Sequence, residues 1–271
     1  MTGASAGAPA GPSRGLTARL AVAGVATGVL SGLLGVGGGV VLVPLLVLAF
    51  GFAQKRAQAT SLVAIVLTAA SGAIAYVVGG EVVLLPALAI VVGGLAGTFV
   101  GGALVHRMSE AQVRTVFAFI MVAVAVRMAW GIEVEGAAEA LELDALSFAG
   151  YVLAGLAMGT LSGLIGIGGG VVLVPILILV FSFTAHEAQG TSLAVMVPIS
   201  LMAAWRNSRH GYTDWRSGTW LGLGGILGAP VGATLALVLP GLVLQRIFAV
   251  LLVASAVQLV LRARRRRGEP S

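Results

Sequence analysis

Gly32–Leu46 reads GLLGVGGGVVLVPLL, and Gly163–Leu177 reads GLIGIGGGVVLVPIL. The two stretches are 131 positions apart (163 − 32), and at this offset sixteen of the twenty-one residues from Gly28 to Leu48 are identical. Inside a helix, each glycine costs about 1 kcal/mol relative to alanine. Two copies of such an unfavourable sequence indicate a duplicated unit in which the glycines have a specific purpose.

The duplication extends well beyond this phrase. The same offset relates QxTS at Gln58–Ser61 to QxTS at Gln189–Ser192, and it relates three glycines spaced by four to three others. We therefore divide the chain into two membrane repeats, 16–131 and 147–262, joined by an external acidic linker, 132–146. A flexible cytoplasmic tail, 1–15, precedes them, and a basic cytoplasmic tail, 263–271, follows them.

The composition is that of an all-α polytopic membrane protein. Of the 271 residues, 58% are hydrophobic and 10% are charged, and the mean hydropathy is +1.05, whereas a soluble domain has about 25% charged residues. The apolar runs are continuous, which favours helices over the alternating strands of a barrel. The pI near 11 does not indicate nucleic acid, because the arginines follow the membrane topology described below.

Several classes of chemistry have no support in the sequence. There is no cysteine, which excludes disulfides, thiol chemistry and cysteine metal sites. We interpret His106, His186 and His210 as interfacial residues near helix ends and not as metal ligands. No nucleophile lies beside a base at membrane depth, so we expect no enzyme activity, no metal and no cofactor.

Each repeat contains five apolar segments. The second segment is only about 13 residues long and contains a proline (Pro44, Pro175), whereas a spanning helix needs about 20 residues. It is therefore either half of a re-entrant hairpin or a short tilted span. The expected segments are 17–35, 40–52, 58–78, 84–105, 113–130, 147–166, 171–183, 189–206, 217–238 and 243–261.

The basic residues set the orientation. With both termini in the cytoplasm, fourteen of the sixteen basic residues fall inside and only Arg127 and Arg246 fall near the outer face, as the positive-inside rule requires. The acidic linker Ile132–Asp144 then lies outside. Because a repeat of five segments, or of three spans and a re-entrant hairpin, crosses the membrane an odd number of times, the second repeat is inverted relative to the first. In secondary transporters with this arrangement, the substrate site lies near the midplane at broken helices.

The glycines form two kinds of pattern. Those spaced by four lie on one helix face and predict close helix packing; they are Gly24, Gly28, Gly32, Gly93, Gly97, Gly101, Gly155, Gly159, Gly163, Gly224, Gly228 and Gly232. The denser clusters Gly35–Gly39 and Gly166–Gly170 predict a backbone break, which membranes tolerate where it is buried or lines a cavity. Each cluster is either a tight turn only, or a turn that also offers N–H groups of a new helix to an anion.

Two QxTS motifs and an absence of carboxylates suggest what such a site binds. The serines and threonines are either helix caps or donors to an oxyanion. No Asp or Glu lies clearly inside a membrane segment, and a cation substrate would therefore lack a counter-charge. The candidate substrate-binding residues are Gly37, Gly38, Gly39, Gln58, Thr60, Ser61, Gly168, Gly169, Gly170, Gln189, Thr191 and Ser192.

The paired GLxGxGGGxxLVPxL phrase, each copy followed by QxTS, resembles the sulfite exporter TauE/SafE family of membrane permeases. Arg209–Ala233 is also similar to that family's basic-Gly-x-x-Asp-Trp-Arg pattern, although the first repeat has Gly80–Leu84 at the equivalent place. The resemblance implies a multi-pass inner-membrane permease that exports sulfite, sulfonates or related organic acids. An anion channel and a non-transporting membrane assembly subunit are the alternatives. The expected partners are a small anion and the lipid bilayer, and the sequence leaves open whether the chain forms a homo-oligomer.

Overall fold

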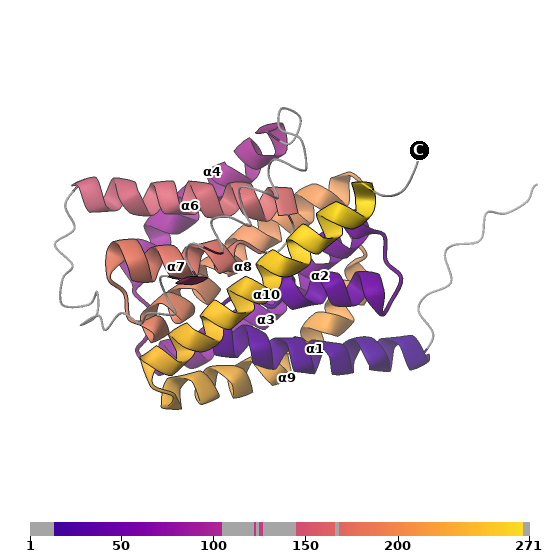
Figure 1. Cartoon of the computed structure of the whole chain (residues 1–271), viewed down its shortest axis with the longest axis horizontal. Coiled ribbons are helices and arrows are strands. Elements are labelled where there is room, and N and C mark those ends of the chain that lie inside the picture. Colours follow the sequence, from indigo (N-terminus) through magenta and orange to yellow (C-terminus); the bar gives the residue numbers. More distant parts are fainter. Residues whose placement is uncertain (1–13, 105–121, 123–124, 127–144, 166–167, 268–271) are drawn as a thin grey trace, which may run out of the picture.

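The computed structural model describes residues 14–104, 122, 125–126, 145–165 and 168–267 (Figure 1). The expected segment 113–130, the linker 132–144, His106 and Gly166 lie wholly or largely outside the described residues. The helices of the first repeat are α1 (Arg14–Leu34), α2 (Gly39–Leu48), α3 (Gln54–Val78) and α4 (Leu84–Leu104). Those of the second are α6 (Ala145–Ile165), α7 (Gly170–Phe181), α8 (Ala185–Arg209), α9 (Trp215–Val238) and α10 (Gly241–Arg267).

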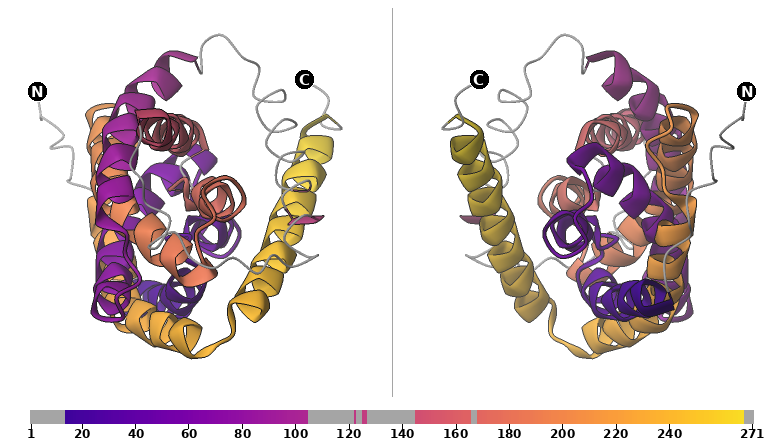
Figure 2. Two further views of the ribbon diagram at one scale, coloured as in Figure 1. Left: turned by 90° about the vertical axis from the view of Figure 1, so that its left-hand side faces the viewer. Right: turned by 90° about the vertical axis from the view of Figure 1, so that its right-hand side faces the viewer.

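The described part of the chain is all-helical, as the composition predicts. Each helix begins and ends within six residues of the segment expected from the sequence. Within the described ranges, five helices are long and apolar enough to cross a membrane, namely Gly15–Leu34, Gln54–Val78, Ala145–Ser162, Ala185–Arg209 and Trp215–Val238. In Figure 2, α10 lies along the opposite flank of the molecule from α4.

The second segment of each repeat is a half-helix. α2 has 10 residues and α7 has 12, which at 1.5 Å per residue is about 15 and 18 Å and too short for a hydrocarbon core of about 30 Å. Figure 1 shows α2 in one half of the molecule and α7 in the other, so the two short helices approach the middle from opposite ends. Each packs against the long helix that follows it, α2 on α3 and α7 on α8, and its length favours the re-entrant hairpin over the short tilted span.

The two repeats are interlocked through the glycines spaced by four. α1 packs along α9, and α4 packs along α6, so each long contact joins a helix of one repeat to a helix of the other. A Cβ atom on Gly24, Gly28 or Gly32 would collide with the α9 backbone. A Cβ on Gly224, Gly228 or Gly232 of α9 would collide with the α1 backbone in return. The glycines that play the same part between α4 and α6 are Gly93, Gly97, Gly155 and Gly159. The predicted packing role of these described glycines is therefore confirmed.

Replacing Gly32 with alanine is expected to reduce the amount of folded protein. The new methyl group would lie 2.8 Å from Ala233 N and closer still to the carbonyl oxygen of Ala229, so α1 and α9 would have to separate, at a cost of about 1–3 kcal/mol. Gly15→Ala is the control, because Gly15 lies on the same helix and a Cβ there would have no atom within 4 Å. Thermal stability in detergent, followed by gel filtration, measures both variants; equal melting temperatures would contradict this packing.

The orientation predicted from the charges places the α2–α3 loop and the α3–α4 loop on opposite sides of the membrane. Ala53 is exposed before α3, and Gly80 after it has open space around its Cβ position. Because the chain has no cysteine, Ala53→Cys and Gly80→Cys each introduce a single thiol. We expect an impermeant maleimide to label Gly80→Cys in intact cells and Ala53→Cys only after permeabilisation. The reverse pattern would invert the topology.

Candidate functional site

Each glycine cluster makes a tight turn that starts a half-helix. Gly35, Gly37 and Gly38 have φ between 68° and 74°, and Gly168 and Gly169 have φ of 85° and 75°. This left-handed region is readily available only to glycine. Gly38 is the N-cap of α2 and Gly169 is the N-cap of α7, and neither end has a capping side chain. The first N–H groups of both short helices therefore lack intrahelical acceptors.

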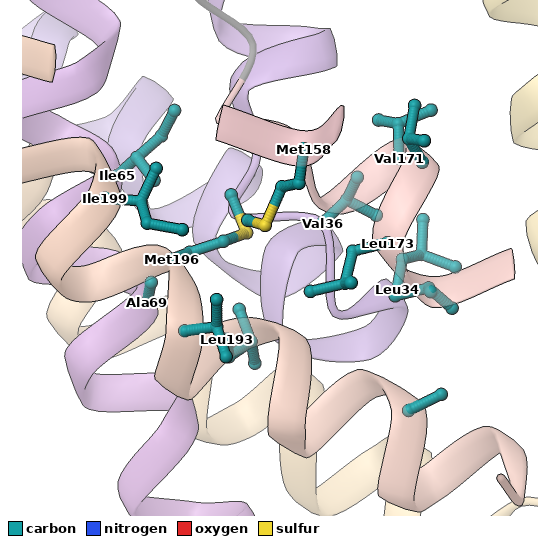
Figure 3. Packing of buried hydrophobic residues seen from close by; sticks show 14 of the residues in the cluster. Leu34, Val36, Ile65, Ala69, Met158, Val171, Leu173, Leu193, Met196 and Ile199 are labelled. Atoms are coloured by element: carbon teal, nitrogen blue, oxygen red, sulfur yellow. The ribbon is translucent and has the colours of Figure 1, made fainter. Parts of the chain in front are cut away.

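The two turns meet at a pair of side chains on the central helices. Met196 of α8 and Ile65 of α3 are equivalent residues of the two repeats (65 + 131 = 196), and both are fully buried. A Cβ on Gly37 would lie 3.0 Å from Ile65 Cγ2, a Cβ on Gly168 would lie 3.2 Å from Ile65 Cδ1, and both would collide with Met196 Cε. Figure 3 shows Met196 reaching into this space.

Contacts between the turns themselves complete this centre. A Cβ on Gly170 would lie 2.7 Å from Met196 Sδ, 3.0 Å from Val36 Cα and 3.1 Å from the Gly35 carbonyl oxygen. Gly38 and Gly169 instead face the long helix before their turn. A Cβ on Gly38 would lie 3.3 Å from the backbone carbonyl oxygen of Thr27 on α1, and a Cβ on Gly169 would lie 2.6 Å from Met158 Cγ on α6. The structure thus brings Gly37, Gly168 and Gly170 together, and Gly38, Gly39 and Gly169 are buried beside them.

The QxTS motifs are not helix caps. α3 begins at Gln54 and α8 at Ala185, so each motif lies in the second turn of its helix, and the cap of α8 is Thr184 in a capping box with Glu187. Thr60 Oγ1 accepts a hydrogen bond from Asp214 N (3.2 Å), and Thr191 Oγ1 accepts one from Val83 N (3.1 Å). Both bonds cross between repeats and hold the loop before α9 or α4.

The other QxTS side chains differ between the repeats. Gln189 is buried against Gly35, and its Oε1 lies 2.9 Å from the Tyr76 hydroxyl, which also donates to the Gly32 carbonyl at 2.9 Å. Gln58 is half-buried, and its carbonyl oxygen accepts from Ser61 Oγ at 2.9 Å. Gln189 and Tyr76 therefore fasten the first turn, at Gly35, to the central helices α3 and α8.

Among the residues that the structure describes, four buried serine hydroxyls have no hydrogen-bond partner. They are Ser31 on α1, Ser162 on α6, and Ser192 and Ser200 on α8, and all are fully buried. Ser31 and Ser162 are equivalent in the two repeats, and Ser31 Cβ would lie 3.4 Å from a Cβ on Gly38. An unsatisfied buried hydroxyl costs about 1–3 kcal/mol. The free hydroxyls near the turns are the kind of donor that an oxyanion needs.

The cytoplasmic end, in the predicted orientation, is joined by an ion pair between repeats. Arg56 Nη2 donates to Asp214 Oδ2 at 2.9 Å, and Asp214 also caps α9 through Ser217 N at 3.0 Å. Burial raises the pKa of Asp214, but its hydrogen bonds to Ser217 and the Arg56 charge outweigh this and hold the pKa below its usual value. The pair is therefore charged at neutral pH. It gives Asp214 of the Asp-Trp-Arg pattern a structural role.

The other end, which is the outer one in the predicted orientation, carries acidic residues. Position 187, which matches Arg56 (56 + 131), is a buried glutamate, and Glu81 lies on the loop before α4. Burial raises the pKa of Glu81; His186 opposes this change and Glu187 adds to it. His186 Nε2 lies 3.1 Å from the carbonyl oxygens of Ala236 and Leu239. Charges of opposite sign thus occupy equivalent positions at the two ends.

Several of these residues could not be found from local motifs. Tyr76, Met196 and Ser31 resemble ordinary core residues in the sequence. The offset of 131 would have paired Met196 with Ile65 and Ser31 with Ser162, but only the folded chain shows that the first pair lies where the two glycine turns meet.

The repeats, broken helices and interlocked halves define a polytopic membrane protein, and this arrangement is found in membrane transporters. The chain belongs to the sulfite exporter TauE/SafE family, whose model matches residues 3–128 and 151–271. It is 28% identical over 235 residues to a probable membrane transporter protein of Xylella fastidiosa (strain Temecula1 / ATCC 700964), covering 86% of this chain and 90% of that one. It is 25% identical over 237 residues to the probable membrane transporter protein YunE of Bacillus subtilis (strain 168), covering 80% and 87%. No solved structure matches the chain.

Proposed function

We propose that this membrane transporter exports small anions such as sulfite, sulfonates or related organic acids through a midplane site between the repeats. The observation that carries the proposal is the meeting of the two glycine turns (Gly37, Gly168) at the centre, beside buried hydroxyls without partners. The starts of two half-helices from opposite ends converge there, and helix N-termini attract anions.

The charges at the two ends support export as the direction. Arg56, Arg206 and Arg209 lie at the cytoplasmic end of the proposed topology, and Glu81 and Glu187 lie at the outer end. A basic entrance concentrates anions where they enter, and an acidic exit disfavours their return. We place the protein in the inner membrane with both termini in the cytoplasm.

The substrate class can be tested by flux into proteoliposomes. We expect saturable movement of radiolabelled sulfite or a small sulfonate, competition by related oxyanions and no movement of choline, a cation of similar size. Counter-exchange of internal and external anion would support a carrier. Flux that does not saturate would favour the alternative of an anion channel, and the absence of flux for every anion would favour a non-transporting assembly subunit.

A further inference from the structure

We propose that the Met196 side chain is the gate of the transport path, occupying in this structure the place through which the anion passes. The inference rests on the proposed function and adds to it the residue that closes the path. Met196 is fully buried on α8, and its thioether end fills the space where the two glycine turns meet.

The Met196 side chain lies against glycines of both turns. A Cβ on Gly37 of the first turn, or on Gly168 or Gly170 of the second, would collide with Met196 Cε or Sδ. The three glycines therefore leave room for this one flexible side chain. A midplane path between the repeats would have to pass this point, and Met196 closes it.

Unpaired hydroxyls lie on both sides of Met196 along α8. Ser192 is four residues before it and Ser200 four residues after it, so all three share one helix face. Both hydroxyls are fully buried without a partner. Such groups are costly in a closed core, and they are satisfied once water or an anion occupies the path. A row of polar positions interrupted by one apolar side chain is the pattern of a closed pathway.

The chemistry of methionine suits a gate of this kind. Its side chain is unbranched and has three rotatable bonds, so it fills irregular spaces and changes rotamer readily. The equivalent residue of the first repeat is the β-branched Ile65, which is stiff at χ1. We therefore assign the moving part to Met196 and the fixed wall to Ile65.

The first test compares anion flux through three variants in proteoliposomes. Met196→Ala removes the gate, and we expect sulfite flux to rise about tenfold, equivalent to about 1.4 kcal/mol of barrier, and to lose saturation. Met196→Leu keeps the volume and should remain saturable. Ile199→Ala is the matched control, since Ile199 is equally buried on the same helix but faces Gly94 of α4.

The second test measures whether an anionic reagent reaches position 196, and it does not depend on flux. Because the chain has no cysteine, Met196→Cys and Ile199→Cys each carry one thiol. The anionic thiol reagent sulfonatoethyl methanethiosulfonate should modify Met196→Cys in membranes, and methanesulfonate should slow the reaction, while Ile199→Cys stays unmodified. Gel filtration checks that the variants fold.

The outcomes separate the gate from the transport function. If the wild-type protein moves no anion and Met196→Cys is unreactive, the proposed function and the gate both fail. If the wild-type protein transports but Met196→Ala behaves like Ile199→Ala, or Met196→Cys is as unreactive as Ile199→Cys, transport stands and the gate is wrong.

Discussion

Gly38→Leu and Gly169→Leu are each expected to reduce transport to background while the chain still inserts into the membrane. Both glycines have positive φ, 74° and 75°, and a side chain in this conformation costs about 1–3 kcal/mol. At Gly169 a Cβ would also lie 2.6 Å from Met158 Cγ. The turn must therefore shift, and with it the start of the half-helix.

Gly51→Leu separates loss of the site from general backbone strain. Gly51 has the same left-handed conformation, φ 68°, but its Cβ position has nothing within 4 Å. We expect this variant to carry the backbone strain and still transport. Flux in proteoliposomes and yield in membranes measure all three variants. Normal transport by Gly38→Leu or Gly169→Leu would mean that the clusters are turns only and do not contact the substrate.

The architecture was largely predictable because it follows from periodic and repeated features. A run of about 20 apolar residues must be a helix in a bilayer, and glycines spaced by four must lie on one face. The duplication then supplied the inversion by counting membrane crossings. The sequence did not show which helices meet: the contact of Gly24 with Leu221 of α9 joins positions that share no local pattern.

The candidate site was predictable in part, because its glycine turns are visible in the sequence. The positive φ values at Gly37 and Gly168 follow from the dense glycines, which have no other evident use. The role of the QxTS threonines was harder to predict, because whether they cap a helix or lie inside it depends on where that helix begins. Thr60 and Thr191 bond to loops of the other repeat, and whether they also contact the substrate remains a prediction.

The two ends of the molecule carry different charged residues at equivalent positions of the repeats. Duplication would make the ends alike, but Arg56 has diverged from Glu187 and Asp214 from Val83. The ion pair between Arg56 and Asp214 therefore has no counterpart at the equivalent positions 187 and 83. With the Arg56 end in the cytoplasm, as the charges predict, anions are expected to be concentrated on that side, and this leads to an expectation about voltage.

Export is expected to follow the membrane voltage and to need no coupling ion. At a cytoplasm-negative potential of 100 mV, a monovalent anion is driven outward by about 2.3 kcal/mol, which corresponds at equilibrium to a gradient of about fiftyfold. The carboxylates within the described residues lie at helix starts or loops: Glu187 belongs to the capping box of α8 and Asp214 to the cap of α9. Neither is placed at the centre to carry a proton beside Met196.

A potassium diffusion potential on substrate-loaded proteoliposomes, with equal pH and sodium on both sides, measures this dependence. For protein molecules oriented as in the cell, efflux should accelerate when the interior is negative and slow when it is positive. Arg56→Gln should lower the rate at low substrate concentration, because it removes a positive charge, 58% exposed, that attracts anions to the entrance, but it should leave the response to voltage unchanged. Because it also breaks the ion pair with Asp214, gel filtration checks that the variant folds. Efflux that ignores voltage and follows a pH or sodium gradient would instead mean that a coupling ion crosses with the anion, and the carboxylates at the outer end, Glu81 and Glu187, would then be the first groups to test as its carriers.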